Sequence, residues 1–115
     1  MPSWGGGGGG WGTATSGGGA GSGTVAAAKT ANYTATTSDN TIPCDTSGGG
    51  FTITLPASPD EGQIINVKKT STDANTLTID GNGNNIDGSA TVTTTATTRP
   101  DFSMQFSAAT DWMIL

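Results

Sequence analysis

The sequence predicts an all-β fold: a small antiparallel β-sandwich or barrel-like module of about eight or nine short strands, behind a Gly-rich extended N-terminal arm. Two observations predict the module. Threonine alternates with apolar residues in several short runs, most clearly in Phe51–Leu55. Clusters of Gly, Asn, Asp and Pro separate these runs at short intervals, as turns do. A third observation predicts the arm, because 12 of the first 23 residues are glycine.

The chain has 115 residues, which is room for one domain. We divide it into a low-complexity arm, residues 1–30, and a β-rich module, residues 31–115. Glycine loses more backbone entropy on ordering than any other residue, so we expect that the arm cannot order by itself. The large side chains of residues 1–23 besides Met1 are Trp4 and Trp11, which we expect to anchor the arm in pockets of a partner.

The first strands follow the arm closely. Tyr33–Thr37 is a candidate strand that ends in a Ser-Asp-Asn turn, and Thr41–Cys44 is a second, shorter one. Pro43 has no N–H to donate to a strand ladder, so this second strand is predicted at a sheet edge or a bulge. Phe51–Leu55 follows a run of three glycines and ends at Pro56.

The second half of the module continues the same pattern. The predicted strands are Gln63–Lys69, Thr76–Ile79, Ala90–Thr98, Phe102–Phe106 and Trp112–Leu115. Between the second and third of these, two Gly/Asn/Asp turn signals enclose one apolar residue, Ile86.

The apolar positions of these strands give the predicted core. Its members are Tyr33, Ile42, Phe51, Ile53, Leu55, Ile65, Val67, Leu77, Ile79, Ile86, Val92, Phe102, Met104, Phe106, Trp112 and Ile114. A core of this size does not offset the conformational entropy of the module, and no disulfide can help because the chain has a single cysteine. We therefore expect an obligate homo-oligomer.

Residues that carry enzyme chemistry are scarce. The chain has no histidine, which excludes Ser-His-Asp and Cys-His catalysis and the commonest transition-metal ligand. Asp60 and Glu61 form a carboxylate pair, but they lie in a Pro-Asp-Glu-Gly turn where acidic residues are ordinary. Cys44 is predicted to be a small buried apolar residue rather than a reactive thiol. We predict no catalytic residues and no cofactor.

One segment imitates the start of a calcium-binding loop. Asp80, Asn82, Asn84 and Asp87 are weak candidate calcium ligands. An EF-hand loop needs Gly at its sixth position and a bidentate Glu at its twelfth, and this chain has Asn85 and Thr91 there. A β-turn in which Asn and Gly adopt positive φ is the favoured interpretation, so no metal is assigned.

Four Thr-x-Thr pairs suggest a flat ice-binding array. They are residues 34/36, 52/54, 76/78 and 91/93, at unequal intervals of 18, 24 and 15 residues. Such an array needs a fixed repeat that stacks the pairs in register. Thr as the solvent-facing member of alternating strands is therefore the favoured interpretation.

Charge limits the partners. The net charge is −5, and the four basic residues (Lys29, Lys68, Lys69 and Arg99) are dispersed along the chain. Binding to nucleic acid or to an anionic membrane needs a clustered basic surface, so neither partner is expected. The N-terminus lacks the basic and apolar regions of a signal peptide.

An ordered series of short motifs carries a family resemblance. The series is Tyr33–Thr36, Asp39–Ile42, Asp45–Gly48, Phe51–Pro56, Val67–Thr70, Asn75–Asp80, Ile86–Gly88 and Asp111–Ile114. In this order it resembles a β-rich module of tailed-bacteriophage virion proteins, found in tail fibres and in capsid-associated fibres or decoration proteins. The resemblance covers about residues 32–115 and leaves the Gly-rich arm outside.

The resemblance implies a non-enzymatic homotrimer on the exterior of the virion, synthesised in the host cytoplasm. It carries over no binding residues. We expect a capsid decoration (cement) or head-fibre protein, whose arm anchors a trimeric β-knob to the major capsid protein or to other virion proteins. A tail-fibre or receptor-binding tip that binds host glycan is the alternative. A bacterial surface or matrix adhesin is a second alternative.

Overall fold

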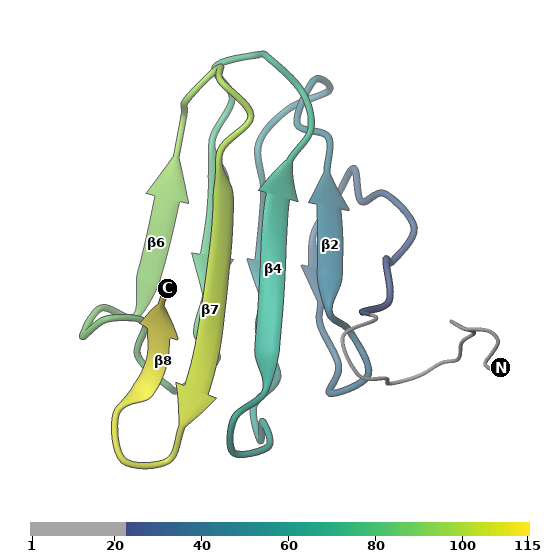
Figure 1. Ribbon diagram of the computed structural model, residues 1–115. Helices are drawn as coiled ribbons and strands as arrows, with labels where there is room; N and C mark the ends of the chain where they lie inside the picture. The colour runs from purple at the N-terminus through teal and green to yellow at the C-terminus, as the bar shows by residue number, and fades with distance from the viewer. Residues whose placement is uncertain (1–22) are drawn as a thin grey trace, which may run out of the picture.

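The computed structural model describes residues 23–115, which form a sandwich of two four-stranded sheets (Figure 1). The front sheet in Figure 1 consists of β2 (Thr41–Cys44), β4 (Ile64–Lys69), β7 (Asp101–Ser107) and β8 (Asp111–Ile114), in that order. The back sheet consists of β1 (Tyr33–Thr34), β3 (Phe51–Thr54), β5 (Leu77–Asp80) and β6 (Thr91–Thr94). The predicted all-β fold class is thus confirmed. No helix among residues 23–115 is long and apolar enough to cross a membrane.

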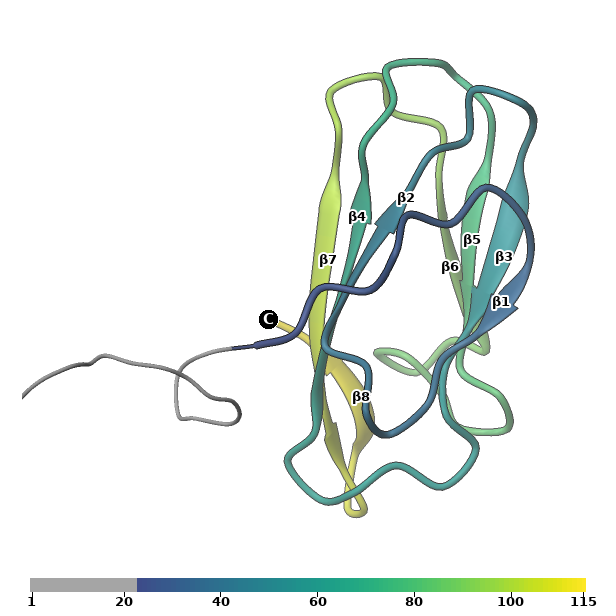
Figure 2. The ribbon, with the colours of Figure 1, turned by 90° about the vertical axis from the view of Figure 1, so that its right-hand side faces the viewer.

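The expectation of an antiparallel sandwich is wrong, because both sheets are mixed. In the back sheet β1, β3 and β5 are parallel, and in the front sheet β2 and β4 are parallel. Pairs β5–β6, β4–β7 and β7–β8 are antiparallel. The reason is the path of the chain, which crosses to the other sheet after each of the first four strands (Figure 2). When the chain returns to a sheet after such a crossing, its new strand runs in the same direction as the strand that it left there.

The core lies between the sheets and is nearly the predicted one. Most of the predicted apolar residues are buried, and Cys44 is buried with them, as expected. Tyr33, Val92, Phe102 and Ile114 are only partly buried and pack against the core from its sides. Tyr33 lies in β1, at one lateral edge of the sandwich. The other three lie in β6, β7 and β8, toward the opposite lateral edge.

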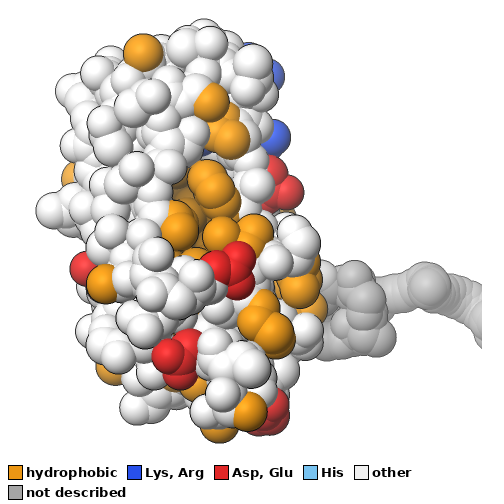
Figure 3. Space-filling model, turned by 90° about the vertical axis from the view of Figure 1, so that its left-hand side faces the viewer, with side chains coloured by type: hydrophobic (Ala, Val, Ile, Leu, Met, Phe, Trp, Pro, Cys, Tyr) orange, Lys and Arg blue, Asp and Glu red, His pale blue; other side chains and the backbone are white. Residues whose placement is uncertain are grey.

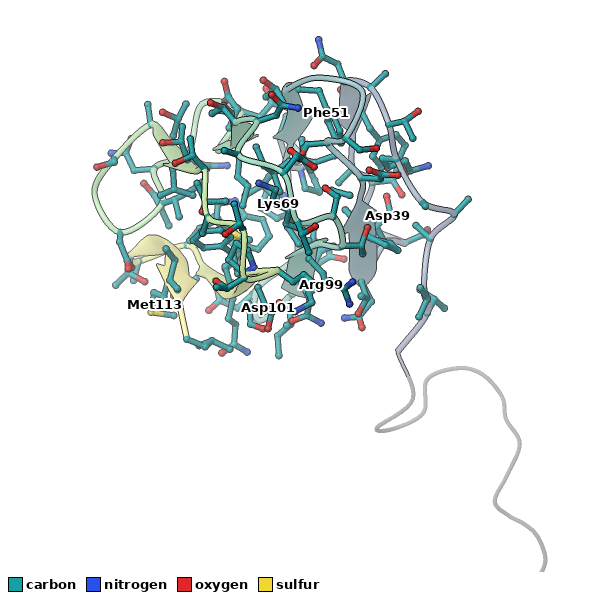
Figure 4. The ribbon with its side chains drawn as sticks, turned by 90° about the horizontal axis from the view of Figure 1, so that it is seen from above. Asp39, Phe51, Lys69, Arg99, Asp101 and Met113 are labelled. Carbon is teal, nitrogen blue, oxygen red and sulfur yellow. The ribbon has the colours of Figure 1, made fainter. Side chains whose placement is uncertain are left out.

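A buried lysine also lies between the sheets, and the sequence did not indicate it. Lys69 is fully buried, and Figure 4 shows it between the two layers. Its Nζ donates hydrogen bonds to the backbone carbonyls of Asp73 at 2.6 Å, Asn75 at 3.1 Å and Ala96 at 2.9 Å. The Asp73 carboxylate lies 3.8 Å away. These acceptors compensate for removing the ammonium from water.

Candidate interaction site

The predicted anchors Trp4 and Trp11 lie outside the described residues 23–115. What the structure places is the point where the arm joins the module. We call residues 24–29 the arm root, and it runs along the outer side of β2 (Figure 2). The geometry of this root decides where the arm leaves the sandwich.

Backbone hydrogen bonds fasten the arm root to β2. The N–H of Thr41 donates to the carbonyl of Thr24 at 3.0 Å, and the N–H of Ala26 donates to the carbonyl of Thr41 at 2.9 Å. The N–H of Lys29 donates to the carbonyl of Pro43 at 2.9 Å. Pro43 therefore lies in β2, the outermost strand of the front sheet, as predicted. It has no N–H to donate, but its carbonyl accepts the hydrogen bond from Lys29.

Side chains extend this attachment to β1. The Lys29 ammonium lies 3.8 Å from the centroid of the Tyr33 ring, a cation–π contact. The Tyr33 hydroxyl donates to the Asp39 carboxylate at 2.7 Å, and the same carboxylate accepts from the N–H of Thr36 at 2.9 Å. The hydrogen bond to Asp39 raises the pKa of the Tyr33 hydroxyl. Residues 24–39 thus close the lateral edge formed by β1 and β2.

The opposite lateral edge, formed by β6 and β8, is less covered. Figure 3 shows hydrophobic side chains gathered there in a hollow between the two sheets. The partly buried apolar residues of the strands around it are Val92 in β6, Phe102 in β7 and Ile114 in β8, and we call these three the apolar hollow. The next residue along the chain, Leu115, is 69% exposed.

One loop closes part of this edge. Ile86, between β5 and β6, is fully buried and forms a bridge to Trp112 in β8. The N–H of Trp112 donates to the carbonyl of Asn85 at 3.0 Å, and the N–H of Asp87 donates to the carbonyl of Trp112 at 2.9 Å. Ile86, the apolar residue predicted between two turns, therefore covers part of the core at this edge, and we call it the plug.

The candidate calcium ligands lie at this loop, and each is engaged with a different partner. Asp80 accepts from the N–H of Asn82 at 2.7 Å, and the Asn82 amide donates to the carbonyl of Leu55 at 3.0 Å. The Asn84 amide donates to the carbonyl of Ala57 at 3.4 Å, and Asp87 accepts from the N–H of Ile114 at 3.2 Å. Asn82 and Asp87 have φ of 55° and 46°, as turn residues do. Within residues 23–115 no group of three or more His, Cys, Asp or Glu could hold a metal ion.

The outer face of the back sheet carries threonines in cross-strand rows. Thr34 lies opposite Thr54, and Thr78 lies between Thr52 and Thr93. The unequal sequence intervals do not prevent this register, because loops of different length absorb them. The Thr-x-Thr pairs are offset from one strand to the next rather than stacked pair on pair. These five hydroxyls form no hydrogen bond to other residues of the described chain, so the face offers free donors and acceptors.

A shallow polar recess lies at one end of the sandwich. It has a volume of about 390 Å³, and Asp45, Asp73 and Arg99 are among its lining residues. Hydrogen bonds from the hydroxyls of Ser71 and Thr46 hold the pKa of the Asp73 carboxyl well below its ordinary value. Asp73 thus stays ionised beside Lys69, which makes it a part of the packing around the buried lysine.

The comparisons with known proteins assign no family. No protein-family model matches the chain, and no curated protein matches it significantly. The interpretation therefore depends on the geometry of the two lateral edges and of the threonine face.

Proposed function

We propose that this chain is a structural protein of a bacteriophage virion, a capsid decoration or head-fibre protein on the particle exterior. The β-module is the knob, three copies associate, and the Gly-rich arm anchors each copy to the major capsid protein. The observation that carries the proposal is the arm root, whose backbone is bonded to β2 while Lys29 and Tyr33 tie it to β1.

A tether must pass force into the body that it holds. The arm root lies parallel to β2 through the Val25–Thr41 and Lys29–Cys44 bridges. A pull on the arm therefore loads several backbone hydrogen bonds together, and these belong to the edge of a sheet with a buried core. An arm that joined the module through an unbonded loop would not have this property.

Removal of the arm tests the proposal. A chain without residues 2–22 keeps its root and should remain a folded β-module, but it should no longer bind purified capsids in a sedimentation assay. Trp4→Ala should weaken capsid binding, whereas the matched control Trp4→Phe, which keeps an aromatic anchor, should retain much of it. Full capsid binding by the deleted chain would show that the arm is not the anchor.

The threonine face favours a second candidate, a tail-fibre or receptor-binding tip. Its unbonded hydroxyls are suited to the hydroxyl groups of a host glycan. Thr52→Val with Thr78→Val removes two of these hydroxyls and keeps the shape of the side chains. If the face binds glycan, adhesion of the full chain to host cells should fall at least about tenfold, because a lost polar contact is costly at a polar site. Thr97→Val, in an exposed loop, is the matched control.

A further inference from the structure

We propose that the apolar hollow binds Trp11 of a neighbouring copy, so that copies of this chain join head to tail. The inference rests on the proposed function in one respect, since it takes the arm as an anchor and the protein as a homo-oligomer. The inference assigns a different binding partner to each of the two arm tryptophans. Trp11 holds the next copy, and Trp4, seven residues further out, remains for the capsid.

The hollow provides the contacts that an aromatic anchor needs. Val92, Phe102 and Ile114 pack on the core with one side and remain partly exposed on the other. They lie at the lateral edge where the gap between the two sheets is least covered. This edge includes β6, which among the described residues pairs with β5 alone. A tryptophan buries about 150–250 Å² when it is enclosed, and partly exposed apolar side chains are the surface against which it can do so. Glycines next to it can follow a strand edge without steric conflict.

The arm is placed to reach a neighbour's hollow. It leaves the sandwich at Thr24, which is bonded to β2, and β2 and β8 are the two outermost strands of the front sheet. The arm root and the hollow are therefore on opposite lateral edges. Twelve residues, Gly12–Gly23, separate Trp11 from Thr24 and span about 40 Å when extended.

Exposed apolar side chains favour a neighbouring copy over the same chain. Val25 in the arm root is 70% exposed and Leu115 beside the hollow is 69% exposed. A head-to-tail contact brings these two edges together and covers both residues. An arm that returned to its own hollow would have to cross the front sheet or the end of the sandwich, and it would leave Val25 and Leu115 exposed. Heterologous contacts of this kind close into a ring when the rotation fits, and a trimer is such a ring.

Engineered cysteines test which copy provides the arm. The chain has one native cysteine, Cys44, which is buried, and burial raises the pKa of its thiol to about 12, so added cysteines are the reactive ones. A chain with Gly12→Cys and Leu115→Cys keeps the Trp11 anchor and should form disulfide-linked dimers and trimers on mild oxidation. Disulfides closed only within one chain would overturn the proposal. The matched control, Gly12→Cys with Ile64→Cys, should crosslink far less, since Ile64 lies on β4 away from the hollow.

A second measurement does not depend on crosslinking. In analytical ultracentrifugation of the full chain, Trp11→Ala and Phe102→Ser should each weaken self-association at least about tenfold. Ile64→Ser, at a residue that is 38% exposed, should leave association unchanged. Retained protection of Cys44 from a thiol reagent reports that a variant is folded. Unchanged association of Trp11→Ala would overturn the inference. Association is measured without particles, so a ring that never binds capsids would contradict only the proposed function.

Discussion

The two lateral edges of the sandwich enclose the same core in different ways. At the β1/β2 edge the chain covers itself, because the arm root bonds to β2 and Lys29, Tyr33 and Asp39 join it to β1. At the β6/β8 edge a single plug, Ile86, closes part of the gap and leaves Val92 and Ile114 partly exposed. One side of this small module is thus closed by its own chain, and the other leaves apolar surface for the association that we propose.

The largest loss of stability is expected beside the plug Ile86, at the β6/β8 edge. Trp112 is fully buried, and its ring meets that of Phe106 edge-on at a centroid distance of 5.4 Å. Trp112→Ala should reduce the free energy of unfolding by about 4 kcal/mol, because it leaves a cavity beside Ile86. Urea unfolding measures this loss. A loss below about 1 kcal/mol would mean that the plug does not close the core.

A somewhat smaller loss is expected at Lys69, which belongs to neither edge. Lys69→Met keeps the aliphatic volume but leaves three partly buried backbone carbonyls without their donor. The free energy of unfolding should fall by about 3 kcal/mol. Lys68→Met is the matched control on the same strand, because Lys68 is not buried. Equal stabilities of the two variants would contradict the role given to the buried ammonium.

A substitution at the β1/β2 edge should reduce the free energy of unfolding by less. Asp39→Ala removes the acceptor for the Tyr33 hydroxyl and for the N–H of Thr36. We expect a loss of about 1 to 2 kcal/mol, and hydrogen exchange at the Ala26 and Lys29 amides should accelerate because the arm root is less firmly held. Unchanged exchange at these two amides would show that the backbone bonds to β2 hold the root without help from the side chains.

The smallest effect concerns pH. The pKa of the Asp73 carboxyl is lowered in the folded chain by hydrogen bonds from Ser71 and Thr46. Its stabilising contribution is therefore complete above about pH 5, begins to fall below the ordinary aspartate pKa near 4, and is fully lost only below the lowered pKa of the folded chain. Asp73→Asn should lower the Tm at pH 7 and lower it by less at pH 3, where part of the contribution is already lost. A difference in Tm that is the same at both pH values would contradict this linkage.

The sequence predicted the strands and the core well because both follow from local alternation. Thr41–Cys44 was predicted with its observed bounds, and Pro43 was placed correctly in an edge strand. Lys69 was missed, since no rule of alternation distinguishes a lysine that will find three carbonyls from one that faces water. The only signal was its phase, which places it on the same side of β4 as Ile65 and Val67.

The candidate sites divide in the same way. The segment Asp80–Asp87 contains turn residues with positive φ, as its residue types predicted, because Asn and Gly tolerate this conformation. The apolar hollow could not be predicted, since Val92, Phe102 and Ile114 have the same pattern as fully buried residues. The threonine rows could not be predicted either, because their register depends on loop lengths between strands that are distant in the sequence.

By itself the sequence determined which side chains face inward, where the strands and turns lie, and that a Gly-rich arm with two tryptophans precedes a β-module. These features depend on a period of two residues and on the backbone preferences of single residues, both of which are local. Three features emerge from the tertiary fold alone: the sheets are mixed, the threonines align, and one lateral edge is closed while the other is partly open. Each of these depends on how often the chain crosses between the sheets, and local preference carries no information about that.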